Sequence, residues 1–231
     1  MSGPTPLTDL VTPIAPIDAL FAGYVAGILP GPAHVLVEAH LEMTGRSRAW
    51  VRDLELLAAG SMAEIQPAEL SDRSAMLSAI LDTDGGPEGD APRAGFPEPT
   101  VPLPCRDRLP RAIRRFIGRD LADVRWKTVL PGLREWKVRE MDGCGASLIR
   151  IRPGVPVPNH THRGAEITLV LEGGFRDSTG HYDAGEIAFA DDSIDHRPIA
   201  DLGRDCICFA VTDAPLRLTG LMGRLARPFA H

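Results

Sequence analysis

The segment from Gly154 to Gly173 constrains this 231-residue chain more than any other. It contains a His-x-His pair, His160 and His162, followed by Glu166 and an apolar run. Because side chains alternate between the two faces of an extended strand, both imidazoles point the same way. Imidazoles and carboxylates are ligands of divalent metals of borderline hardness. The segment therefore predicts a strand that presents three of the four ligands of a metal site.

The fourth ligand has to come from a later part of the chain. Residues 185–196 contain a strand-like apolar stretch, a turn rich in aspartate and then His196. A strand that lies beside the first would bring this histidine to the pair. The predicted metal ligands are therefore His160, His162, Glu166 and His196.

The first part of the chain predicts a small helical bundle. Apolar residues recur there at helical spacing, between glycine and proline stop signals. The predicted helices cover residues 16–27, 33–43, 47–59 and 71–81. We expect this bundle to be held together by the packing of apolar residues such as Leu20, Phe21, Trp50 and Leu54.

The remainder predicts an antiparallel β domain. Residues 83–104, rich in Gly, Pro, Asp and Glu, are typical of a linker. A helix with an arginine-rich face follows at 109–124. Strand-like segments with turn residues between them then cover 125–130, 133–140, 146–152, 165–171, 186–190 and 204–211. The predicted fold class is α+β, with a helical domain over 1–82 and an antiparallel β-barrel over 105–231.

Charge and cysteine content limit the class of function. The net charge of −6 argues against a nucleic-acid-binding protein. Residues 1–90 carry 13 acidic and 4 basic residues, a balance of −9, which leaves +3 for the rest. The four cysteines form no CxxC pair, and we find neither a secretory signal nor an apolar run long enough to span a membrane. We expect a cytoplasmic protein that binds neither nucleic acid nor membrane.

The two histidine segments resemble the two signatures of the cupin superfamily. The first signature is complete, with every position filled: Gly154, His160, His162, Glu166 and Gly173. In the second, Gly185 and His196 are in register, whereas its Pro, Gly and Asn positions hold Asp191, Ser193 and Ala200. The resemblance implies a jelly-roll-like barrel that holds a metal through these ligands.

The second half is also similar to the cupin domain of ChrR-type anti-sigma factors, most closely between residues 146 and 218. In that family a helical N-terminal domain binds and silences an extracytoplasmic-function sigma factor. The C-terminal cupin is required for the response to singlet oxygen or related oxidants. The resemblance implies a transcriptional regulator with a sigma factor as partner and one divalent metal in the cupin. Zinc is favoured over iron, manganese or nickel, and a homodimer is a further family expectation.

The helical half departs from this family at the structural zinc site of its relatives. Those proteins use a histidine before the first helix and a His-x3-Cys-x2-Cys arrangement. Here His40 is in place, but the cysteine positions hold Thr44 and Ser47, and the early histidine position falls near Ile14 or Ala15. Because a hydroxyl is a poor zinc ligand beside a thiolate, we expect no N-terminal zinc.

Two alternatives to the regulator stay open. One is a metal-dependent cupin enzyme of the dioxygenase or isomerase class, acting on an unknown small molecule. Four protein ligands leave two positions open on a six-coordinate ion but none on tetrahedral zinc. The other is a sensor that binds a small organic ligand without turnover. No catalytic residue beyond the metal ligands can be named, and we favour the regulator over the enzyme.

Overall fold

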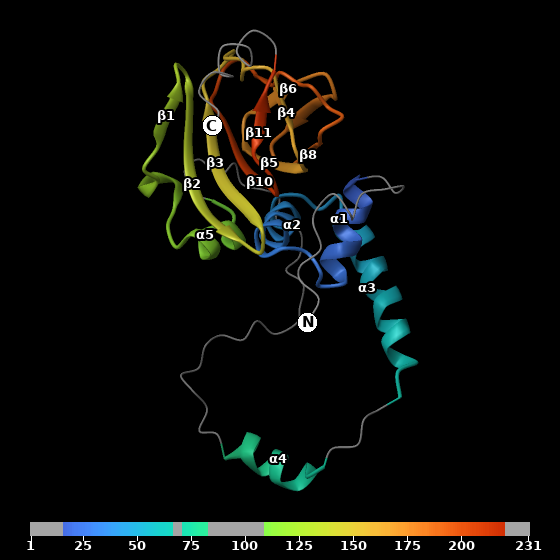
Figure 1. Ribbon diagram of the computed structural model, residues 1–231. Helices are drawn as coiled ribbons and strands as arrows, with labels where there is room; N and C mark the ends of the chain where they lie inside the picture. The colour runs from blue at the N-terminus through green and yellow to red at the C-terminus, as the bar shows by residue number, and fades with distance from the viewer. Residues whose placement is uncertain (1–15, 67–70, 83–108, 220–231) are drawn as a thin grey trace.

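The computed structural model describes residues 16–66, 71–82 and 109–219 (Figure 1). The predicted linker over 83–104 lies outside the described residues. The helices are α1 (Pro16–Val25), α2 (Gly31–Met43), α3 (Arg48–Ala63), α4 (Arg73–Leu81) and α5 (Arg111–Ile117), with a short 3-10 helix at Leu121–Asp123. The predicted helix over 109–124 ends early because Gly118 adopts a left-handed conformation, with φ of 71°, and caps α5.

The β domain consists of antiparallel sheets. Its strands are β1 (Lys127–Leu130), β2 (Leu133–Met141), β3 (Cys144–Ile151), β4 (His160–His162), β5 (Glu166–Glu172), β6 (Gly174–Arg176), β7 (His181–Asp183), β8 (Ile187–Ala190), β9 (Ile199–Ala200), β10 (Cys206–Thr212) and β11 (Leu216–Leu218). In the described part of the chain, a 6-stranded sheet has the order β1-β2-β3-β10-β5-β8. A 3-stranded sheet, β7-β6-β9, and the pair β11-β4 complete the domain.

These strands confirm the predicted α+β class, with helices followed by a C-terminal antiparallel β domain. Within residues 109–219, the sheets are not hydrogen-bonded into one closed barrel. Two isolated bridges lie outside the regular strand ladders, Pro156 with Ile199 and His160 with His196. The short strands β6, β7, β9 and β11 were not predicted, because two or three residues are too few to show a period-two pattern.

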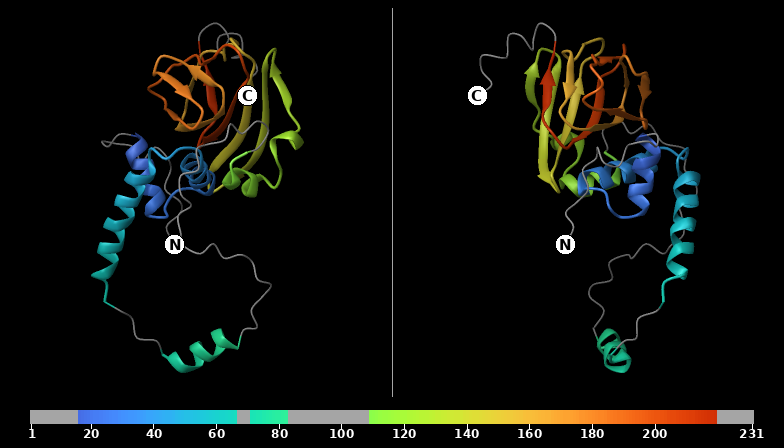
Figure 2. Two further views of the ribbon diagram at one scale, coloured as in Figure 1. Left: turned by 180° about the vertical axis from the view of Figure 1, so that it is seen from behind. Right: turned by 45° about the vertical axis from the view of Figure 1, so that its right-hand side comes forward.

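Helix α2 is buried against the β domain rather than within a separate bundle. Leu36 and Val37 are fully buried, and they belong to one hydrophobic cluster with Ile113 of α5, Leu148 of β3 and Phe209 of β10. Figures 1 and 2 show α1, α2 and α5 gathered at one end of the β structure. The helical part and the β domain therefore share a core. The predicted boundary between them remains a prediction.

Carboxylates at helix N-termini reinforce this junction. Asp142, in the turn between β2 and β3, accepts a hydrogen bond of 2.8 Å from the backbone N–H of Gly31 at the start of α2. Glu42, near the end of α2, accepts hydrogen bonds from the N–H groups of Arg111 (2.6 Å) and Ala112 (2.9 Å) at the start of α5. Negative charge at a helix N-terminus satisfies unpaired donors and complements the helix dipole.

The predicted core of the helical part is only partly correct. Leu20 and Phe21 are buried and Leu54 is partly buried, as predicted. Trp50 is 45% exposed, so its assignment to the core is wrong. The physical reason is that α3 extends away from the β domain, and Val51 is its only fully buried residue in the described structure (Figure 1). None of the described helices is both long and apolar enough to cross a membrane.

The shared core predicts that the helices and the β domain unfold together. Replacing the fully buried Leu36 by alanine leaves a cavity between them and should lower the free energy of unfolding by about 2–5 kcal/mol. Urea unfolding, followed by circular dichroism and by tryptophan fluorescence, should show one coincident transition at lower urea. As a control, Leu56→Ala, at a residue 63% exposed on α3, should change stability by less than about 0.5 kcal/mol. Two separate transitions would contradict the shared core.

Candidate metal centre

Backbone pairing brings the two predicted histidine segments together. The N–H of His160 donates to the carbonyl of His196 (3.1 Å), and the N–H of His196 donates to the carbonyl of His160 (3.0 Å). On β4, His160 and His162 are both buried while Thr161 between them is less so. The prediction that both imidazoles face the same side of a strand is thereby confirmed.

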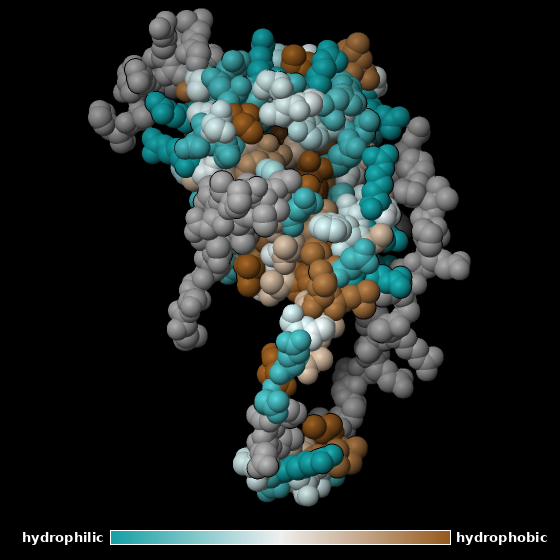
Figure 3. Space-filling model, turned by 90° about the vertical axis from the view of Figure 1, so that its right-hand side faces the viewer, coloured by the Kyte–Doolittle hydropathy of each residue, from teal (hydrophilic) through white to brown (hydrophobic). Residues whose placement is uncertain are grey.

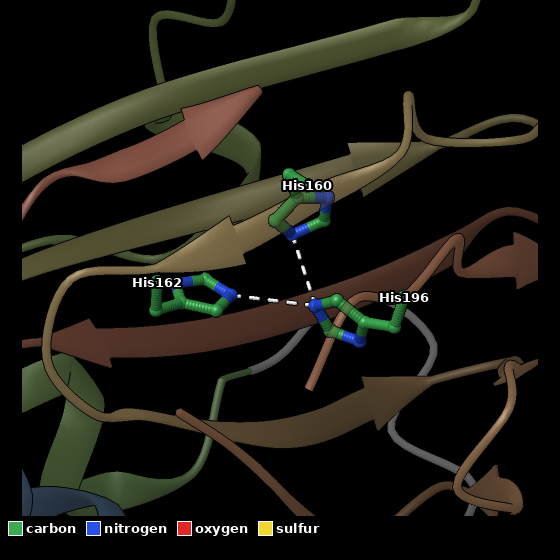
Figure 4. Close-up of side chains that lie close together, drawn as sticks. All are labelled: His160, His162 and His196. Carbon is green, nitrogen blue, oxygen red and sulfur yellow. Dashed lines mark hydrogen bonds between the residues drawn. The ribbon is translucent and has the colours of Figure 1, made fainter. Parts of the chain in front are cut away.

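The three imidazoles meet at their Nε2 atoms (Figure 4). Nε2 of His196 lies 3.0 Å from Nε2 of His160 and 3.3 Å from Nε2 of His162. All three residues are buried, with at most 6% of their surface exposed. Among the described residues, they form a buried group whose ligand atoms are close enough to hold one ion.

The hydrogen-bond partners fix the tautomers of two of these rings. Nδ1–H of His160 donates to the carbonyl of Pro158 (2.8 Å), and Nδ1–H of His196 donates to Asp177 (2.7 Å). A neutral imidazole carries one proton, so both Nε2 atoms present lone pairs to each other. Two lone pairs at 3.0 Å repel unless a cation lies between them.

A divalent metal satisfies this arrangement. Two nitrogen ligands bound about 2.1 Å from one ion at adjacent positions are roughly 3.0–3.4 Å apart. The observed separations of 3.0 and 3.3 Å fall in that range. Burial lowers the pKa of His160, and burial together with the neighbouring imidazoles lowers the pKa of His162 to about 4. These rings are therefore neutral, the form that binds metal, at neutral pH.

Glu166, the fourth predicted ligand, lies beside the cluster. Its Oε2 is 3.8 Å from Nδ1 of His162, and its Oε1 accepts from the hydroxyl of Thr168 (3.1 Å). Nδ1 of His162 is buried and has no hydrogen-bond partner in the described structure. Glu166 therefore lies on the Nδ1 side of this ring, while its burial raises the pKa of its carboxyl. Its role as a direct ligand remains a prediction.

Asp177 is a site residue that the sequence did not reveal. It follows β6, its side chain is 2% exposed, and its Oδ2 accepts from Nδ1–H of His196. Its Oδ1 accepts from both the backbone N–H and the hydroxyl of Thr179. Burial acts to raise the pKa of Asp177, but these hydrogen bonds outweigh it and lower the pKa to about 2. Such a carboxylate orients a metal-binding histidine and raises its basicity.

Comparison with known proteins identifies the family of the chain. Residues 115–215 match the family model described as the ChrR Cupin-like domain, a range that contains all four predicted ligands. The anti-sigma-E factor ChrR of Cereibacter sphaeroides is 39% identical over 213 residues, which cover 92% of this chain and 95% of that protein. The chain belongs to the ChrR family of anti-sigma factors. A crystal structure of Rhodobacter sphaeroides SigE in complex with the anti-sigma ChrR matches with a TM-score of 0.68 and 36% identity. That match covers 85% of this chain and 96% of the other.

At the N-terminal zinc position of the ChrR family, His40 has hydrogen-bond partners on both nitrogens. Its Nδ1–H donates to the carbonyl of Gly185 (2.7 Å), so its Nε2 accepts from the hydroxyl of Ser47 (2.8 Å). Gly185 has a φ of 90°, which favours glycine, in the turn before β8. The imidazole therefore joins α2 to the β domain, and the serine at a family cysteine position completes its hydrogen bonding.

Removing the carboxylate beside His196 should weaken metal binding in this ChrR-family protein. We expect the purified wild type to contain close to one metal ion per chain. Asp177→Asn should lower metal affinity by roughly 10–100-fold, because the neutral amide orients and polarises His196 less well. Competition with a fluorescent chelator measures the affinity, and elemental analysis measures the stoichiometry. The matched control is Asp123→Asn, at an exposed aspartate away from the cluster, which should bind metal like the wild type. Equal affinity in Asp177→Asn would refute the orienting role.

The His40 hydrogen bonds predict a pH dependence of stability. Burial lowers the pKa of His40 in the folded state, although Gly185 and Glu186 act to raise it. The unfolded state then binds more protons below pH ~6.5, so stability falls as the pH drops from there through the folded pKa. His40→Asn removes this titration and should reduce the slope by at most about 1.4 kcal/mol per pH unit. Urea unfolding between pH 7 and pH 5 measures both slopes, and identical slopes would count against this role of His40.

Proposed function

We propose that this protein is an anti-sigma factor that binds an extracytoplasmic-function sigma factor through its N-terminal helices. The observation that carries the proposal is the apolar surface of α3 and α4, which the described part of the chain leaves uncovered. The solved relative is itself a complex of SigE with ChrR. The partner proposed here is therefore of the same class as the partner in that complex.

The exposed residues form two groups on the helices. On and after α3 they are Trp50, Leu56, Leu57, Met62 and Ile65, which are between 45% and 70% exposed. On α4 they are Met76, Leu77, Ile80 and Leu81, which are between 48% and 74% exposed. Figure 3 shows hydrophobic side chains on the helical part, including α4 at the bottom of the view. Apolar surface of this kind marks a protein-binding site.

Charge supports the same partner. The acidic balance of −9 over residues 1–90 suits a basic surface on the sigma factor. Complementary charge accelerates association more than it raises affinity, so the apolar side chains supply most of the binding energy. We place the protein in the cytoplasm, where a sigma factor meets RNA polymerase, and a homodimer remains a family expectation.

The β domain is proposed to hold one divalent metal, with zinc favoured and no second zinc at His40. When bound, the ion supplies a positive charge that satisfies the converging lone pairs of His160, His162 and His196. Glu166 is proposed as the fourth ligand, and Asp177 holds the Nδ1 proton of His196. The lack of a free nitrogen on His40 supports the absence of an N-terminal zinc.

Regulation is proposed to follow from the core that α2 shares with the β domain. A signal can release the sigma factor only by favouring a state of the protein that binds it less well. Because α2 contacts β3, β5 and β10, a rearrangement of those strands reaches the helices directly. An oxidative or small-molecule signal at the cupin is the family-based expectation.

The metal-dependent enzyme remains the second candidate because a cavity adjoins the histidine cluster. That cavity contains one carboxylate away from the cluster, Glu135, whose Oε1 already accepts from the hydroxyl of Ser147 (2.8 Å). This pairing favours binding over acid–base catalysis, so the regulator is the better supported function.

Substitutions on the exposed helices test the sigma interface. Leu57→Glu with Ile80→Glu places charge in surfaces that become desolvated on binding. We expect affinity for a co-expressed cognate sigma factor to fall by at least about 30-fold, equivalent to about 2 kcal/mol. Co-purification and surface plasmon resonance measure the loss. The control is Leu202→Glu, at an exposed leucine of the β domain (83%), which should bind normally. Undiminished binding by the double variant would rule out this interface.

A further inference from the structure

A cavity of about 150 Å³ lies in the β domain beside the histidine cluster. Most of its lining is apolar: Val129, Leu133, Ile149, Ile151, Val157, Phe175, Ala188, Phe189, Ala190, Pro198, Cys208 and Leu216. Val129 and Leu216 are about half exposed, so they mark where the cavity opens to solvent. The short side chains of Ala188 and Ala190 on β8 leave the space that a larger residue would fill.

The size of the cavity limits its ligand. A cavity of about 150 Å³ with apolar walls holds a molecule the size of benzene. Sites for drug-sized ligands are larger, about 300–1,000 Å³. The occupant is therefore small, and most of its surface has to be apolar to match the walls.

Apart from Glu135, which accepts a hydrogen bond from Ser147, the polar part of the lining belongs to the candidate metal centre. His160, His196, Glu166, Thr168 and Asp177 all contribute to the cavity surface. A ligand in the cavity therefore reaches the proposed metal, which attracts an oxygen donor. The ligand class is thus an apolar body with an oxygen atom that faces the cluster.

The charge of the side chains at the cluster indicates whether the oxygen donor of the ligand is neutral or anionic. Asp177 accepts hydrogen bonds on both oxygens and Glu166 accepts from Thr168, so two carboxylates already stand beside the imidazoles. Together they balance the charge of one divalent ion. A carboxylate on the ligand would leave a net negative charge in an apolar cavity, which is costly. A neutral hydroxyl or carbonyl oxygen adds no charge.

We propose that this cavity binds a small, neutral, apolar molecule with one hydroxyl or carbonyl oxygen, such as a six-carbon alcohol or ketone. The inference rests on the proposed metal centre and names the ligand class of that site.

The position of the cavity connects its occupant to the helices. Ala188, Phe189 and Ala190 of β8 line it, and Gly185 in the turn before β8 accepts the hydrogen bond from His40 of α2. The next residue, Glu186, pairs with Arg46 between α2 and α3 at 3.2 Å. A ligand that displaces β8 therefore acts on the two side chains that hold the helical part to this turn.

The test compares two probes of matched size, hexan-1-ol and pentanoate, on the metal-loaded full chain. Isothermal titration calorimetry and ligand-dependent thermal shift measure binding, and elemental analysis confirms that the metal is retained. We expect hexan-1-ol to bind at least about tenfold more tightly than pentanoate. Removal of the metal with a chelator should weaken hexan-1-ol binding. It should also reduce the difference in affinity between hexan-1-ol and pentanoate.

Cavity-filling variants test the location. Ala188→Leu fills the cavity, and Leu216→Trp narrows its opening at an exposed position where folding is not at risk. Each should weaken hexan-1-ol binding by about tenfold or more while one metal per chain is kept. Ala122→Leu, at an exposed alanine outside this cavity, should bind like the wild type.

Three results would overturn the proposal. They are equal or tighter binding of pentanoate, no binding of either probe to the metal-loaded protein, and undiminished binding in Leu216→Trp and in folded Ala188→Leu. Sigma binding is measured in parallel without a probe. If the protein binds hexan-1-ol but not the sigma factor, only the proposed anti-sigma function is contradicted. If it binds the sigma factor but not hexan-1-ol, only the ligand proposal is contradicted.

Discussion

The burial of α2 against the β domain is the constraint on which the rest of this structure depends. Leu36 and Val37 occupy the same hydrophobic cluster as the interior residues of β3 and β10. This contact holds α2 against the β domain, with Glu42 at the N-terminus of α5 and His40 opposite Gly185. It also leaves α3 with only one fully buried residue in the described structure, so the apolar side chains of that helix face outward. The exposed apolar surface, which we propose as the partner interface, therefore lies on helices other than α2.

The metal centre illustrates how a protein prepares a binding site at a cost in stability. Three imidazoles converge in a buried space, and two of them donate their Nδ1 protons to Pro158 and Asp177. Without a cation, their lone pairs face one another with no donor between them. Such an arrangement persists only because the paired backbones of His160 and His196 and the turn at Asp177 hold it in place. The site would bind an ion more tightly because its ligands lose little conformational freedom on binding.

Much of the fold could be predicted from the sequence, and the successes and failures have physical causes. The strands of the six-stranded sheet were predicted because four or more residues show the alternation of a half-buried strand or a continuous apolar run. The pairing of His160 with His196 followed from ligand chemistry. Asp177 was not predicted, because a carboxylate 19 residues from its histidine has no spacing rule. Trp50 was misassigned because a helical pattern shows which residues share a face but not whether this chain or another covers it. The hydrogen-bond partner of His40 could not be predicted from the sequence either, because Gly185 is 145 residues away.

Because His40 is held by hydrogen bonds, the two halves of the molecule differ in their need for a metal ion. In this chain an imidazole, a hydroxyl and a peptide carbonyl hold the junction between α2 and the β domain. All three groups are part of the polypeptide itself. The proposed metal site, in contrast, would depend on a supply of the ion. If the proposed metal became scarce, the β domain would therefore lose its ion while the hydrogen bonds of His40 were kept. A regulator built in this way would still hold its partner when metal is scarce, and would lose only the metal-dependent part of its response.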